Sequence, residues 1–116
     1  MIQFLKNIFG GGTDISELIA NGAAIVDVRT AGEYADGHLN RSINIPLDQL
    51  ENNFSKLDKS KPVITCCASG MRSASAKNIL KSNGFENVHN GGGWNSLMAF
   101  DKKSVECHRN SNQSIQ

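Results

Sequence analysis

A short loop rich in small residues carries two adjacent cysteines and could do nucleophilic chemistry. Its sequence is Cys66-Cys67-Ala68-Ser69-Gly70-Met71-Arg72-Ser73, between a predicted strand and a predicted helix. Unpaired backbone N–H groups and the positive end of the helix dipole stabilise an anion at such a helix start. Because the thiolate is the nucleophilic form of cysteine, the position favours covalent catalysis. Arg72 adds a fixed positive charge that suits an oxyanion substrate.

The elements around this loop predict an α/β domain. Residues 61–65 are a lysine and a proline followed by apolar and β-branched residues, which predicts a strand, and residues 73–81 predict a helix. Further strands are predicted at residues 23–28, 42–45 and around Val88. Strands that alternate with helices predict a mainly parallel sheet, with the active site at the carboxyl ends of its strands. Cys67 lies at one such end.

Five further segments are predicted from local patterns. Residues 14–22 predict a short helix, and residues 30–37 predict one helical turn followed by a loop. Apolar residues spaced by three and four predict an amphipathic helix over residues 47–57. Residues 91–93 are three glycines, which predict a loop, and residues 94–100 predict a last helix.

Length, composition and charge describe an ordinary globular domain. The 116 residues are 39% apolar and 20% charged, with a net charge of +1, which gives no argument for a nucleic-acid or membrane partner. We expect an N-terminal segment over residues 1–12, the domain over residues 13–100, and a polar, flexible tail over residues 101–116. The three cysteines are too few for a secreted disulfide framework, so we expect reduced thiols and a cytoplasmic location.

Several motifs follow one another in the order of a known family. They are Ile25-Val26-Asp27-Val28-Arg29 with Glu33, then Gly37-His38-Leu39, then Asn44-Ile45-Pro46, then the cysteine loop, and last Gly92-Gly93-Trp94. Together they resemble the rhodanese-like sulfurtransferase family over about residues 13–100. The resemblance implies a rhodanese-like three-layer α/β fold, with a five-stranded, mainly parallel sheet flanked by helices. It also implies a six-residue active loop, residues 67–72, in which Cys67 carries a persulfide.

The implied reaction is sulfur transfer in two covalent steps. The Cys67 thiolate attacks the outer sulfur of thiosulfate or of another anionic donor, and a thiol or cyanide then removes that sulfur. The predicted substrate-binding residues are Ala68, Ser69, Gly70, Met71, Arg72 and Ser73. No metal or organic cofactor is needed. A relay module that takes sulfur from a protein donor is the alternative within the same fold.

Counting from Cys66 instead gives C-x5-R, the spacing of cysteine-dependent phosphatases and arsenate reductases. Thr65 stands where those phosphatases commonly have histidine, and Gly70 fits the shorter loop that starts at Cys67. Strand alternation also makes Cys66 the last residue that faces the core. A non-catalytic binding domain on the same scaffold is a further alternative, and the intact cysteine argues against it.

Three charged or polar residues near the site are predicted to be structural rather than catalytic. Asp27 and Arg29 end a buried strand, where charges need partners, so we expect them to fix the strand end to neighbouring loops. His38 is predicted to be a hydrogen-bonded structural histidine. The Cys107-His108 pair is a weak metal motif, because a metal site needs three or four ligands.

Overall fold

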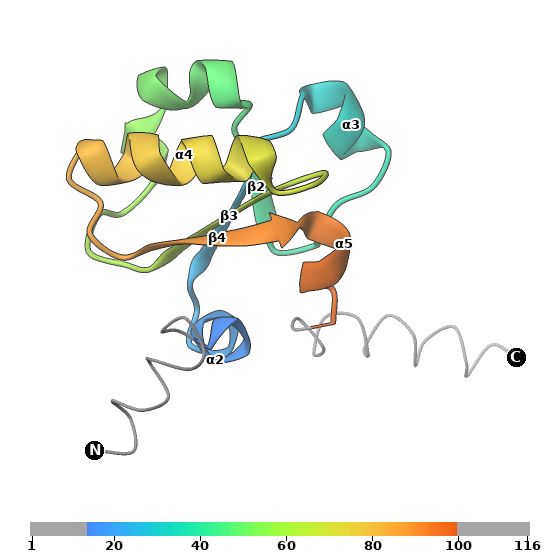
Figure 1. The fold of residues 1–116 in the computed structure, drawn as a ribbon, viewed down its shortest axis with the longest axis horizontal. Helices are drawn as coiled ribbons and strands as arrows, with labels where there is room; N and C mark the ends of the chain where they lie inside the picture. The colour runs from blue at the N-terminus through green and yellow to red at the C-terminus, as the bar shows by residue number, and fades with distance from the viewer. Residues whose placement is uncertain (1–13, 100–116) are drawn as a thin grey trace, which may run out of the picture.

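Four parallel strands form a single sheet in the order β2-β1-β3-β4 in the computed structural model, which describes residues 14–99. The elements are α2 (Ile15–Ala20), β1 (Ala24–Asp27), α3 (Ala31–Ala35), β2 (Ser42–Asn44), η1 (Leu47–Asn52), η2 (Phe54–Lys56), β3 (Val63–Cys67), α4 (Met71–Ser82), β4 (Val88–Gly93) and α5 (Trp94–Leu97). The α4 helix and the η1 segment cover one face of the sheet, and α2 covers the other (Figure 1). The predicted parallel α/β architecture is confirmed, but the sheet has four strands within residues 14–99 rather than five.

The central strands β1 and β3 are buried on both faces, which is why they read as almost continuous apolar runs. Alternate residues of β3 enter two separate core clusters. Val63 and Cys67 face the α4 layer, where they join Leu80 and other apolar side chains. Ile64 and Cys66 face the opposite layer. The two adjacent cysteines therefore point to opposite sides of the sheet.

The segment predicted as one amphipathic helix forms two 3-10 segments, η1 and η2, separated at Asn53. The Asn53 side chain donates to the Gln49 carbonyl at 2.7 Å, where an α-helix would place the backbone N–H of Asn53. That backbone N–H instead donates to the Leu50 carbonyl, three residues earlier. The α-helical prediction is wrong, although Leu50 is fully buried as the apolar spacing indicated.

The three glycines at residues 91–93 belong to β4 rather than to a loop. A Cβ atom on Gly91 would lie 2.8 Å from the Ile64 side chain, and one on Gly93 would lie 2.9 Å from the Ala68 carbonyl oxygen. Glycine thus lets β4 approach both β3 and the cysteine loop. The following helix is shorter than predicted, since α5 ends at Leu97.

Some predictions fall outside the described residues, among them the N-terminal segment, the C-terminal tail and Cys107. Within residues 14–99, no helix combines the length and the apolar character that crossing a bilayer requires.

Candidate active site

Cys67 ends β3, and the loop of residues 68–70 leads directly into α4. Gly70 has a φ of +106°, in the left-handed region that glycine adopts without a Cβ penalty. This conformation lets the Gly70 N–H donate to Cys67 Sγ at 2.9 Å, and the Ser73 N–H approaches the same sulfur at 3.4 Å. The start of α4 therefore aims backbone donors at one thiol.

These donors determine the ionisation of Cys67. Burial alone would raise its pKa, but a hydrogen bond with the Ser73 hydroxyl and hydrogen bonds from the amides of Ser73, Gly70 and Ser69 outweigh burial and lower the pKa to about 7. The Ser73 Oγ lies 3.5 Å from Cys67 Sγ. Near neutral pH about half of this thiol is a thiolate.

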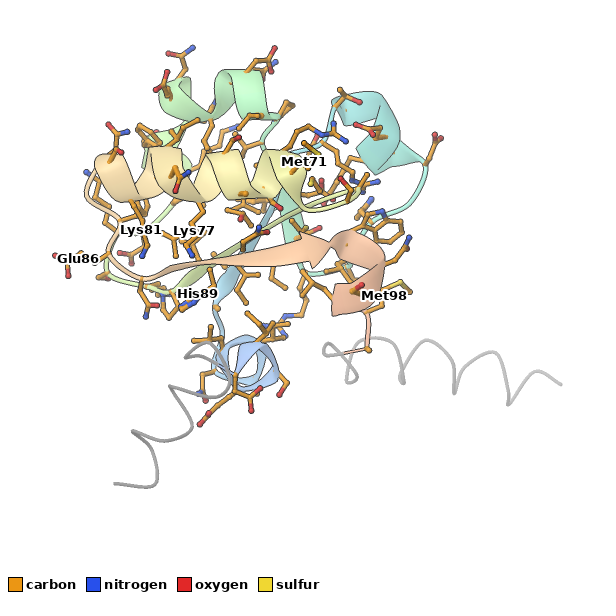
Figure 2. The ribbon with its side chains drawn as sticks, viewed as in Figure 1. Met71, Lys77, Lys81, Glu86, His89 and Met98 are labelled. Atoms are coloured by element: carbon orange, nitrogen blue, oxygen red, sulfur yellow. The ribbon has the colours of Figure 1, made fainter. Side chains whose placement is uncertain are left out.

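The side chains of the loop differ in exposure. Cys67 has no solvent-exposed surface, whereas Ala68 and Ser69 are exposed. The sulfur is therefore closed to solvent in this conformation. Met71 is 78% exposed at the start of α4 (Figure 2), so its side chain does not enclose Cys67.

Arg72 forms a two-point ion pair with Glu33 of α3. Its two terminal nitrogens lie 2.7 Å and 3.1 Å from Glu33 Oε1 and Oε2. Hydrogen bonds from Arg72 first, and then from Thr30, lower the pKa of Glu33 to about 2. Arg72 was predicted to orient an anionic substrate, and its contact with a residue 39 positions earlier was not foreseen.

Asp27 and Arg29 form a buried ion pair beneath the site. Arg29 Nη2 lies 2.8 Å from Asp27 Oδ2, and the two side chains are 5% and 0% exposed. Arg29 also donates to the carbonyls of Gly37 and Glu33, and its guanidinium lies 4.7 Å from the centre of the Trp94 ring. The pair fixes the end of β1 to the α3 segment and to α5.

Cys66 lies on the other face of β3, in an apolar environment. Its side chain is fully buried among Ile25, Ile64, Leu97 and other apolar residues. Burial, with a smaller contribution from the Asp27 carboxylate, raises the pKa of Cys66 to about 12. The thiol therefore stays protonated and lies away from the loop amides, which argues against a C-x5-R enzyme that uses Cys66.

His38 lies against α3. Its Nδ1 is 2.7 Å from the Tyr34 carbonyl oxygen, and its ring stacks on the Tyr34 ring with centroids 3.7 Å apart. These contacts are those of a structural histidine.

Asn90 of β4 connects to the site and was missed in the sequence. Its Oδ1 accepts from the Ser73 hydroxyl at 2.6 Å and from the Gly92 N–H at 2.9 Å, and its Nδ2 donates to the Gly70 carbonyl at 3.2 Å. Its position in the sequence could have indicated this role, because Asn90 stands near the carboxyl end of a predicted strand. That end lies at the same edge of the sheet as Cys67.

The described residues do not assemble a metal site. Within residues 14–99, no group of three or more His, Cys, Asp or Glu side chains is arranged to hold a metal ion. Cys107 and His108 lie beyond this range.

Comparison with known proteins gives one family and several relatives. The sequence model of the family described as "Rhodanese-like domain" matches residues 12–99. The thiosulfate sulfurtransferase PspE of Escherichia coli is 36% identical over 70 residues, which cover 59% of this chain and 67% of PspE. The putative sulfurtransferase YtwF of Bacillus subtilis is 33% identical over 77 residues, which cover 66% and 72% of the two chains.

A solved structure described as rhodanese with anions, from E. coli, superposes with a TM-score of 0.60 at 34% identity, covering 64% of this chain and 89% of that one. Other relatives are longer. The matched region spans 54% of the uncharacterized protein YqhL of B. subtilis and 27% of a tRNA uridine(34) hydroxylase of Buchnera aphidicola.

Proposed function

The chain belongs to the rhodanese-like domain family, and we propose that it is a sulfurtransferase that moves the outer sulfur of thiosulfate to a thiol or cyanide through a persulfide on Cys67. The observation that carries this proposal is the pair of N–H groups, from Gly70 and Ser73, that converge on Cys67 Sγ. They stabilise a thiolate before the reaction and an anionic persulfide after it. The name of PspE, a thiosulfate sulfurtransferase, supports thiosulfate as the donor.

The first step forms one S–S bond and breaks another. The Cys67 thiolate attacks the outer sulfur of thiosulfate, and sulfite leaves with the electron pair of the original S–S bond. In the second step the acceptor attacks the outer sulfur of the persulfide, and the Cys67 thiolate is the leaving group. Because Cys67 is half ionised near pH 7, neither step needs a general base.

A protein sulfur donor is the second candidate, and one observation favours it. Met71 exposes 78% of its surface beside the active loop, and exposed methionines adapt readily to protein partners. In this form of the proposal the persulfide chemistry is unchanged, and the partner that delivers the sulfur also displaces the loop. Both forms of the proposal place the protein in the cytoplasm, where reducing conditions keep Cys67 as a thiol.

The test is the intact mass of the reduced protein after incubation with thiosulfate. We expect a gain of about 32 Da on Cys67, one sulfur atom, which cyanide removes. Cys67→Ser should abolish the adduct, and the matched Cys66→Ser variant should retain it. An adduct that maps to Cys66 would overturn the proposal. If the adduct forms only with a protein persulfide donor, the proposed donor becomes that protein and thiosulfate is excluded.

A further inference from the structure

Glu33 occupies the face of Arg72 that an oxyanion would use. The pair makes two parallel N–H···O contacts, at 2.7 Å and 3.1 Å, and planar oxyanions bind guanidinium groups in this way. The carboxylate is also held in place without Arg72. Glu33 Oε1 accepts from the Thr30 N–H at 3.0 Å, and Thr30 caps α3 in return through a reciprocal bond to the Glu33 N–H.

We propose that Glu33 is a specificity-determining residue that makes the site favour sulfur donors of low charge over dianionic donors such as thiosulfate. Its carboxylate acts as a built-in competitor for Arg72, so a donor must displace it to use the guanidinium. The inference rests on the proposed function, in that Cys67 must accept sulfur.

The charges around the loop support this role. Glu33 offsets the charge of Arg72, and the thiolate of Cys67 adds a negative charge, so a dianion is attracted to the loop less strongly than it would be to an unpaired Arg72. The other cations of α4 are Lys77 and Lys81, which gather around His89 of β4 away from Met71 (Figure 2). Burial, and then these two ammonium groups, lower the pKa of His89.

Another anion can also take the place of Glu33 in the ion pair with Arg72. The Arg72 and Glu33 side chains are 36% and 39% exposed, so water and salt compete for both groups. A donor oxyanion can therefore replace the carboxylate without entering a closed core. The low pKa of Glu33, about 2, keeps this competitor charged at every physiological pH.

The test compares two donors that transfer the same terminal sulfur and differ in charge, thiosulfate (a dianion) and methanethiosulfonate (a monoanion). Glu33→Gln removes the charge and keeps an amide that can still complete the capping box. With cyanide as acceptor, we expect KM for thiosulfate to fall about fivefold and KM for methanethiosulfonate about twofold, with kcat retained for both. Raising the salt concentration should reduce the difference between wild type and variant.

Glu86→Gln is the matched control, because it removes one exposed carboxylate away from Met71 and the active loop (Figure 2). It should leave both KM values unchanged. In the Glu33→Gln, Arg72→Ala double variant the gain for thiosulfate should disappear, since the effect acts through the guanidinium.

Two results would overturn the inference while leaving sulfur transfer intact. One is a thiosulfate kcat/KM that falls in Glu33→Gln, which would mean that the carboxylate positions Arg72 for the donor. The other is an equal change for both donors. If the wild-type protein forms no persulfide with either donor, the proposed function fails for these donors, and the inference fails with it.

Discussion

Cys66 and Cys67 are the same residue in adjacent positions, yet they lie in two different regions of the molecule. Burial raises the pKa of Cys66 to about 12, whereas hydrogen bonds that outweigh burial lower that of Cys67 to about 7. Both side chains have 0% exposed surface, so exposure does not separate them. The hydrogen-bond donors at the start of α4 distinguish the two cysteines, because these donors reach only the face of β3 that carries Cys67.

The difference shows that strand alternation decides which thiol reacts. A shift of one residue in β3 would place Cys66 under the loop and Cys67 beside Ile25 and Leu97. Burial keeps a sulfur protonated where no donor reaches it, as at Cys66, and several donors together outweigh burial at Cys67.

The largest expected effect is the difference in alkylation between the two cysteines. At pH 7 about half of Cys67 and about one in 10⁵ of Cys66 is thiolate, which outweighs the higher intrinsic nucleophilicity of the more basic thiolate, so iodoacetamide should modify Cys67 at least about 100-fold faster. Peptide mass mapping over a time course measures both rates in one sample. The Cys67 rate should rise about tenfold per pH unit below 7 and level off above it, because only the thiolate reacts. Similar rates for the two thiols would refute the comparison.

A large effect on stability is expected on the Cys66 side of β1. Arg29→Ala leaves the Asp27 carboxylate buried without its partner, which should cost about 3–5 kcal/mol of unfolding free energy. Urea denaturation followed by circular dichroism measures the loss. Arg72→Ala is the matched control, because its ion pair is half exposed, and its midpoint should hardly change. Equal losses in the two variants would contradict the buried role of Asp27 and Arg29.

A smaller effect is expected when one donor is removed from the Cys67 side. Ser73→Ala deletes the hydroxyl that stabilises the thiolate, so the pKa of Cys67 should rise by about one unit. The ultraviolet absorbance of the thiolate, followed over pH, reports the shift. Ser75→Ala, two residues along α4 at an exposed position, should leave the titration unchanged.

The smallest effect is expected for a substitution of Asn90, which should lower the pKa of Cys67 rather than raise it. The Ser73 hydroxyl donates its single proton to Asn90 Oδ1 over an O···O distance of 2.6 Å, and it accepts from the Cys67 thiol at 3.5 Å. Asn90→Ala frees the proton for Cys67, so the pKa of Cys67 should fall by about a few tenths of a unit. The same absorbance titration tests it, and a rise as large as in Ser73→Ala would show that Asn90 instead supports the loop amides.

Local patterns predicted the parts of the site that lie close together in the sequence. The strand, the loop and the start of α4 follow one another directly, so their residue types were enough to place Cys67 at a helix start. The ion pair between Glu33 and Arg72 joins elements 39 residues apart, and Asn90 contacts Ser73 from 17 residues away. Such contacts depend on how α3 and β4 pack, and the sequence pattern does not specify this.

The errors in the fold also have local physical causes. The apolar spacing of residues 47–57 fits both an α-helix and a 3-10 helix, and the Asn53 side chain decides between them by taking the Gln49 carbonyl. The glycines at residues 91–93 suggested a loop because they lack side chains. Gly91 instead makes room for Ile64, and Gly93 makes room for the Ala68 carbonyl.

The enclosure of Cys67 has a consequence for recognition. A persulfide places a second sulfur about 2 Å beyond Sγ, while the Gly70 nitrogen already lies 2.9 Å from Sγ. Loading the carrier must therefore change the contact between the Gly70 N–H and the sulfur of residue 67. We expect the active loop to have a different surface shape in the thiol and persulfide forms. A protein that accepts the sulfur could then recognise the persulfide form by its shape before sulfur transfer begins.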